Sequence, residues 1–166
     1  MSYIELLRWL HVIGATVLLG TGAGIAFFML MADRTRDPVL IAHTAGVVVI
    51  ADLVFTATAV LLQPVTGYLL ARELGWPFTQ GWLTLSLMLY VLTGCCWLPV
   101  VWIQIRMRDI ARASVRDGRP LPPAYHALFR RWFVLGIPAF AAVLIIIWLM
   151  LAKPQFALFA SFVESQ

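Results

Sequence analysis

The sequence predicts an all-α protein, a four-helix transmembrane bundle with its N- and C-termini on the periplasmic side. Two properties of the 166-residue chain lead to this fold class: 62% of its residues are hydrophobic and only 12% are charged. A soluble domain is about half apolar and about a quarter charged, and one core of this size could not bury so much apolar surface. The lipid bilayer is the solvent in which such a composition is stable.

Four apolar runs are long enough to cross a hydrocarbon layer of about 30 Å at about 1.5 Å per helical residue. Because backbone groups in lipid must be hydrogen-bonded internally, each run is expected to be a helix. The predicted helices are residues 4–32, 39–71, 82–116 and 124–152. They form a single membrane domain over residues 1–154, and residues 155–166 are predicted to be an amphipathic tail at the membrane surface.

The distribution of basic residues predicts the orientation of these helices. The connections after the first and third helices carry nine arginines, and the opposite side carries three basic residues, Arg8, Arg72 and Lys153. The nine are Arg34, Arg36, Arg106, Arg108, Arg112, Arg116, Arg119, Arg130 and Arg131. Cytoplasmic loops carry the excess of Lys and Arg, so the arginine-rich side is assigned to the cytoplasm of a bacterial inner (plasma) membrane.

The net charge of +4 therefore indicates contact with membrane lipid and gives no reason to expect a nucleic-acid partner. We also expect the bundle to associate with itself or with another membrane protein.

Polar residues inside spanning helices are costly, so each is a candidate functional residue. On the second helix, Asp52, Thr56, Gln63 and Thr66 share one face at 100° per residue. The third helix has a similar face, formed by Ser86, Tyr90, Trp97, Gln104 and Arg108. The fourth helix is apolar from residue 132 to residue 152 and is expected mainly to pack against the others.

Asp52 is the most costly of these groups, because a carboxyl in the membrane must be hydrogen-bonded or neutral. Its expected partner is Gln104 or Arg108, both of which approach from the third helix. Two interpretations stay open for Asp52. It is either a hydrogen-bonded clamp between helices or part of a proton relay or ligand site.

His11 lies about two turns inside the first helix, at the expected depth of Gln63 on the second helix and of residues 86–90 on the third. Neutral imidazole is a common ligand of haem iron, so His11 is either a hydrogen-bonding residue or a ligand of haem b. The other two histidines, His43 and His126, lie near the opposite end of the bundle and cannot reach the same iron.

Small residues and prolines mark further features of the helices. Gly20, Gly22 and Gly24 are expected to allow close approach of a helix or of a flat cofactor. Pro64 and Pro99 interrupt backbone hydrogen bonding and are expected to free carbonyl groups that bend a helix or line a cavity.

Several segments together resemble an uncharacterised family of small predicted bacterial integral membrane proteins, across residues 1–154. They are Trp9-Leu10-His11-Val12, the glycines at 20, 22 and 24, Ala51-Asp52, Gln63-Pro64-Val65-Thr66-Gly67, the run from Trp97 to Arg108, and Ala152-Lys153-Pro154. The resemblance implies a small membrane protein and brings no known activity.

The chain is also distantly similar to HemJ-type protoporphyrinogen oxidases, which are small haem-associated membrane proteins. His11 matches their first-helix histidine and Lys153-Pro154 their terminal Lys-Pro, which implies haem at His11. Their third-helix Trp-Leu-His-Val-Lys motif corresponds here to Trp82-Leu83-Thr84-Leu85-Ser86, which has neither the histidine nor the lysine.

Two functions follow as hypotheses from these observations. The first is a b-type haem-binding redox protein with His11 as the iron ligand. The alternative is a non-enzymatic membrane subunit or small-solute transporter, with a polar interior formed by Asp52, Gln63, Tyr90, Gln104 and Arg108. The sequence identifies no catalytic residue.

The predicted orientation is tested with reporter fusions. A reporter that is active only in the periplasm is expected to work after Gln166 and to fail when inserted near Gly118, because the arginine-rich connections stay in the cytoplasm. The measurement is reporter activity in intact cells, with a reporter active only in the cytoplasm as the reciprocal control. The opposite pattern would overturn the orientation.

Overall fold

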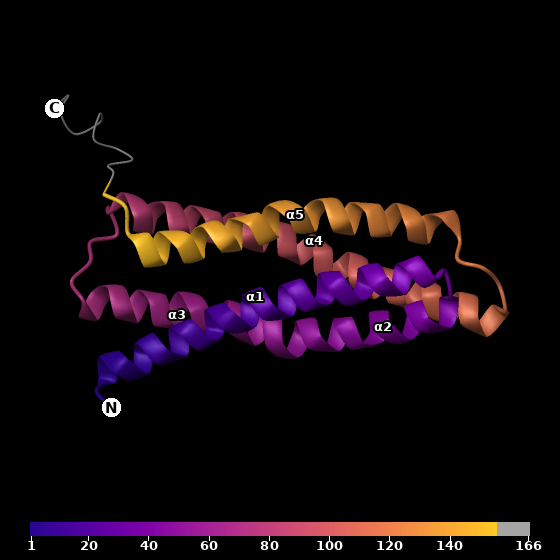
Figure 1. The fold of residues 1–166 in the computed structure, drawn as a ribbon, viewed down its shortest axis with the longest axis horizontal. Helices are drawn as coiled ribbons and strands as arrows, with labels where there is room; N and C mark the ends of the chain where they lie inside the picture. Colours follow the sequence, from indigo (N-terminus) through magenta and orange to yellow (C-terminus); the bar gives the residue numbers. More distant parts are fainter. Residues whose placement is uncertain (156–166) are drawn as a thin grey trace, which may run out of the picture.

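The computed structural model describes residues 1–155, and these residues form four helical spans (Figure 1). The first span is α1 (Tyr3–Thr35). The second span consists of α2 (Pro38–Ala51), η1 (Asp52–Thr56) and α3 (Ala57–Glu73) in succession. The third is α4 (Gly81–Asp117) and the fourth is α5 (Pro123–Ala152). Each span is long and apolar enough to cross a membrane, which confirms the four-helix transmembrane prediction. The tail predicted at the membrane surface, from residue 156 onward, lies outside the described residues.

Local signals place the helix ends. Ser2 and Glu5 form a reciprocal capping box at the start of α1. Asp37 caps α2 by accepting a hydrogen bond from the backbone N–H of Val39 at 2.8 Å. Gly118 adopts a left-handed conformation with φ of 60° and ends α4, as glycine does at helix C-termini, and Pro123 occupies the first turn of α5.

The sequence predicts a single helix over residues 39–71 with an interruption at Pro64, and the backbone also widens into a π-helical turn over Asp52–Thr56. The N–H of Ala57 donates to the carbonyl of Asp52, five residues back. A π turn holds one residue more than an α turn and is frequent at functional sites. Both ends of this turn, Asp52 and Thr56, point into the protein and are buried.

The spans pack as two pairs. Helix α1 packs along α2, η1 and α3, and α4 packs along α5, while α2 joins the pairs by contacting α4. The start of α1 and the end of α5 lie at the same end of the molecule (Figure 1). Apolar side chains such as Phe28, Leu61 and Leu98 point outward, as expected for surfaces that contact lipid.

Two apolar clusters close the ends of the bundle. At the end that holds the α1–α2 and α4–α5 connections, all four spans contribute to one core that includes Met29, Ile41, Met107 and Tyr125. At the other end, a smaller cluster joins Ala71, Trp82, Leu83 and Leu149. The region between these clusters is less tightly filled.

The close helix contact occurs at glycines other than the three expected. Within the described residues, an added Cβ would meet nothing at Gly20 or Gly22, and at Gly24 it would meet only Phe28 of the same helix. The expectation of a close neighbour there is therefore wrong for contacts within the chain. Gly14 instead accommodates the Gln63 side chain, and Gly67 accommodates the His11 ring, at the crossing of α1 and α3.

Gly14→Ala is expected to destabilise the protein by about 1–3 kcal/mol, because its new methyl group overlaps the Gln63 amide. Gly20→Ala is the matched control on the same helix. It adds a methyl group in open space and is expected to be neutral or stabilising by up to about 1 kcal/mol. The measurement is reversible unfolding in mixed detergent followed by circular dichroism, and equal stability of the two variants would contradict this packing.

Candidate functional site

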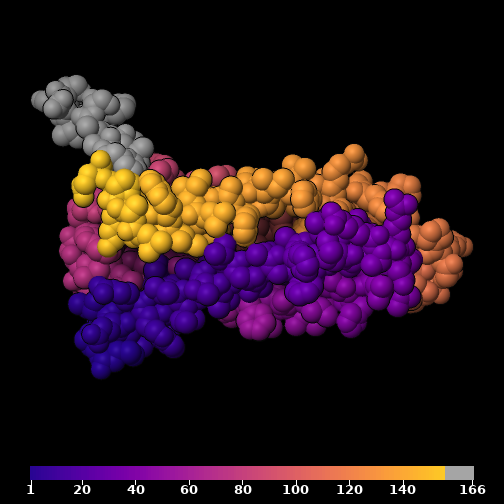
Figure 2. Space-filling model, viewed as in Figure 1, coloured from indigo at the N-terminus to yellow at the C-terminus, as the bar shows by residue number. Residues whose placement is uncertain are grey.

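A cavity of about 630 Å³ lies between the two apolar clusters. All four spans line it: α1 from Ala15 to Ala26, η1 and α3 from Asp52 to Gln63, α4 from Tyr90 to Gln104 and α5 from Trp132 to Ile147. The surface of the molecule is recessed along the line where α1 and α5 meet (Figure 2).

Small residues on facing helices explain why this space is open. On α1, Gly22 and Ala26 line the cavity, and Gly136 and Ala139 line it from α5. An added Cβ at Gly22 or Gly136 would meet no described atom within 4 Å. The two helices therefore present short side chains to each other without approaching closely enough to fill the gap.

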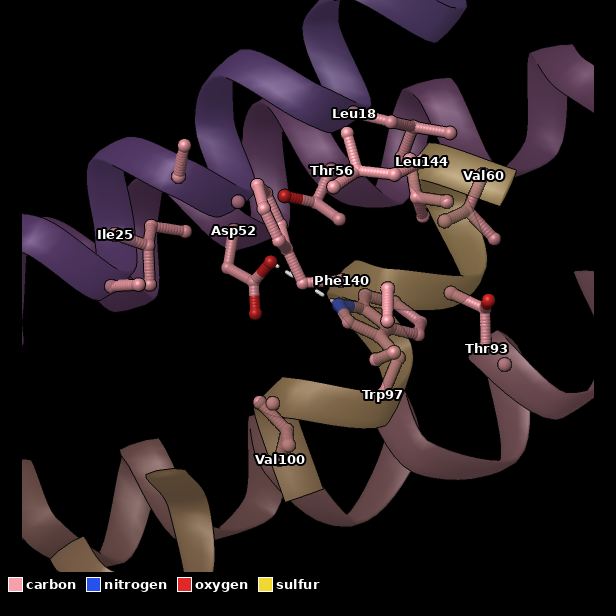
Figure 3. Close-up of a pocket in the computed structure, with 18 of the residues that line it drawn as sticks. Leu18, Ile25, Asp52, Thr56, Val60, Thr93, Trp97, Val100, Phe140 and Leu144 are labelled. Carbon is pink, nitrogen blue, oxygen red and sulfur yellow. Dashed lines mark hydrogen bonds between the residues drawn. The ribbon is translucent and has the colours of Figure 1, made fainter. Parts of the chain in front are cut away.

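One wall of the cavity carries a hydrogen-bonded polar cluster centred on Asp52. Trp97 Nε1 of α4 donates to Asp52 Oδ1 at 3.2 Å (Figure 3). Gln104 Nε2, with the amide oriented as its neighbours require, donates to Asp52 Oδ2 at 2.9 Å. Gln104 Oε1 in turn accepts a hydrogen bond from Trp132 Nε1 of α5 at 3.1 Å. The cluster joins three spans, and we name its four residues the Asp52 cluster.

The structure places Gln104, rather than Arg108, beside Asp52. Arg108 lies about one turn further along α4, where its guanidinium pairs with the neighbouring Asp109 at 2.8 Å. Arg108 does not line the cavity, whereas Asp52, Gln63, Tyr90 and Gln104 do.

The fourth predicted helix has a polar role that the sequence reasoning missed. Trp132 was taken as part of an apolar helix that mainly packs, yet its indole N–H completes the Asp52 cluster. The available signal was the indole itself, because a buried Trp N–H usually finds an acceptor.

Tyr90 reaches from α4 to α3 because of a proline. Pro64 has no N–H, so the carbonyl of Val60, four residues earlier, lacks its helical partner. The Tyr90 hydroxyl donates to this carbonyl. Pro64 and Pro99 were expected to free carbonyl groups, and at Pro64 the freed group lies at the cavity wall, since both Val60 and Tyr90 line it.

His11 forms a second polar contact, between α1 and α3. Gln63 Nε2 donates to the His11 carbonyl at 2.7 Å, and His11 Nδ1 lies 2.8 Å from Thr66 Oγ1. The Thr66 hydroxyl donates its single proton to the Leu62 carbonyl at 2.8 Å, so we assign the proton of this pair to Nδ1. The lone pair of the neutral imidazole is then on Nε2.

The cavity and His11 do not together fit a haem. The cavity has space for a large ring, but the residues that line it include no histidine, cysteine or methionine. His11 lies outside the lining, with its ring edge against Gly67. A haem bound through His11 would therefore not occupy the interior of this bundle.

Four apolar spanning helices around a partly polar interior define an integral membrane protein of the multi-pass class. The chain belongs to the family described as "Predicted integral membrane protein (DUF2269)", whose model matches residues 5–154. This result confirms the resemblance to an uncharacterised membrane-protein family. No curated protein and no solved structure matches the chain.

Trp132→Phe is expected to destabilise the protein by about 1 kcal/mol or more, because it leaves the Gln104 carbonyl oxygen without its donor. Trp148→Phe is the matched control, since Trp148 lies on the same helix but is exposed. The measurement is the free energy of unfolding in mixed detergent.

Trp132→Phe removes both ring volume and a hydrogen bond. To distinguish the two effects on stability, the substitution is repeated in a Gln104→Leu background. The cost of the substitution should fall there, because the acceptor is already absent. An unchanged cost would show that the hydrogen bond contributes nothing.

Proposed function

We propose that this protein binds a small lipophilic molecule with one polar group inside its transmembrane bundle. In this role it serves as a small-solute carrier or as a non-enzymatic membrane subunit of the bacterial inner membrane. The observation that carries the proposal is the cavity, whose wall is apolar apart from a few convergent polar groups around Asp52. Small-molecule sites have this composition and typically measure about 300–1,000 Å³.

The position of the polar groups supports a ligand that enters from lipid. The Asp52 cluster lies in the middle of long spanning helices, and the recess between α1 and α5 is lined by apolar side chains such as Leu18, Ile137 and Leu144. An apolar body bound there keeps the environment that it has in the bilayer. Its polar group has no hydrogen-bond partner in the lipid interior and gains one at the cavity wall.

Triphenylmethanol is a suitable probe, because it has a bulky apolar body and one hydroxyl group. The full chain, purified in a neutral detergent, is expected to bind the tritiated probe saturably. Gly22→Leu and Gly136→Leu are each expected to weaken binding at least tenfold, because both positions line the cavity and have open space at the first atom of a new side chain. The measurement is equilibrium binding by scintillation proximity.

Gly20→Leu is the matched control for this experiment. Gly20 lies two residues from Gly22, is exposed, does not line the cavity, and has open space for a side chain. It should leave binding unchanged. Equal binding by wild type and both cavity-filling variants would contradict the proposed site.

The haem hypothesis for His11 stays a prediction, and an absorption spectrum distinguishes it from the cavity proposal. A protein that binds only a colourless lipophilic solute is expected to have no Soret band after purification with haem supplied. A Soret band that His11→Ala abolishes, and that His43→Ala and His126→Ala preserve, would establish haem binding. The lone pair assigned to His11 Nε2 and the similarity of His11 to the first-helix histidine of HemJ-type proteins favour this outcome.

A further inference from the structure

We infer that the ligand of this cavity is a lipophilic cation, whose positive centre lies beside the carboxyl group of Asp52. The inference rests on the proposed function and adds the chemical class of the ligand. It comes from the charge and hydrogen-bond balance of the Asp52 cluster, together with the aromatic side chains around it.

The first step is the balance of charge. Asp52 is the only acidic residue that lines the cavity, and the lining includes no lysine, arginine or histidine. The nearby Arg108 is paired with Asp109 instead. A carboxyl group at this depth is 3% exposed and has two neutral N–H donors but no cation among residues 1–155. No described residue therefore supplies a counter-charge to the ionised form of this carboxyl group, and a cation that binds beside it would supply that charge.

The second step is the balance of donors and acceptors. The side-chain N–H groups of Trp97 and Trp132 are both used inside the cluster, as is the N–H of Gln104 that donates to Asp52. The Tyr90 hydroxyl donates to Val60. A carboxylate offers about four lone-pair positions, and two of those on Asp52 are occupied. Asp52 therefore keeps two acceptor positions for a ligand, beside the second N–H of Gln104 and the Thr56 hydroxyl, and a cation or a donor suits the carboxyl group better than an anion does.

Thr56 adds an independent observation. Its hydroxyl lines the cavity one turn from Asp52, is more than nine-tenths buried, and has no hydrogen-bond partner among the described residues. Both side chains project from η1 toward the same space (Figure 3). The hydroxyl is therefore a further polar group beside Asp52 at the same wall, where a bound ligand can contact both.

The third step is the aromatic lining. Tyr90, Trp97, Trp132, Phe133 and Phe140 all border the cavity. The face of an aromatic ring is the negative end of its quadrupole and attracts ammonium and similar cations, most strongly where water is excluded. A carboxyl group and several aromatic rings around one apolar space favour a cation with apolar substituents over an anion or a neutral molecule.

Three probes of similar shape test the inference in detergent solution: tetraphenylphosphonium, which is a cation, triphenylmethanol, which is neutral, and tetraphenylborate, which is an anion. The full-length wild type is expected to bind the cation at least tenfold more tightly than the alcohol, and the anion most weakly. Asp52→Asn should weaken cation binding by about 30-fold or more, because it removes the charge that pairs with the ligand. Binding of the alcohol should change less than about threefold.

Asp109→Asn is the matched control, because it removes an acidic side chain of α4 that is exposed and outside the cavity. It should leave the affinity for all three probes unchanged. Circular dichroism and gel filtration establish that each variant is folded. If Asp52→Asn does not fold, the order of the three probes on the wild type alone decides the outcome.

The outcomes separate the inference from the proposed function. Equal affinities for cation and alcohol, both lost in Gly22→Leu, would refute the cation and keep the cavity as a binding site. Tetraphenylborate binding as tightly as tetraphenylphosphonium would also refute it. Failure of all three probes to bind the wild type would remove the proposed function together with the inference.

Discussion

The requirement that a carboxyl group in the membrane be hydrogen-bonded determines how the spans of this protein are arranged. Asp52 receives N–H groups from Trp97 and Gln104 of α4, and Gln104 accepts the N–H of Trp132 from α5. Because these bonds form only at short range, the acidic residue on the second span holds the third and fourth spans close to it. Breaking the set would leave polar groups unpaired in an apolar environment, where no water can replace the lost partners.

The other helix pair is held by a separate set of contacts. Gln63 donates to the His11 carbonyl, His11 contacts Thr66, and the glycines at positions 14 and 67 make room for the two large side chains. Polar bonds and close approach therefore act together at the crossing of α1 and α3. The pair formed by α4 and α5 is joined to it through α2, through the Asp52 cluster and by direct contact of α1 with α5 in the apolar core around Met29, and the cavity lies beyond that contact.

The sequence predicted the features that depend on local signals. Span length and apolar composition predicted the four helices, and the helical positions of Asp52, Gln104 and Arg108 predicted that one of the latter two contacts Asp52. The sequence did not predict the π turn, because no pattern of residue types specifies a π-helical turn. It left Arg108 as an alternative partner, because a long side chain reaches in several directions and only the fold shows that Asp109 is nearer. For Gly22 the sequence left open a neighbouring helix or a flat cofactor, and the structure shows open cavity space there, with no helix in close contact.

The cavity and its carboxyl group are difficult to explain by stability alone. A methyl group at Gly22 or Gly136 would occupy open space at the cavity, and a neutral residue at position 52 would avoid the cost of burying a carboxyl group. The π turn and the unpartnered Thr56 hydroxyl occur at the same wall. Natural proteins depart from rules of packing and polar satisfaction mainly at functional sites. When several departures coincide in one small region of an otherwise well-formed bundle, a common cause is more economical than separate defects. A ligand that fills the cavity and carries positive charge to Asp52 would remove each of these costs when it binds.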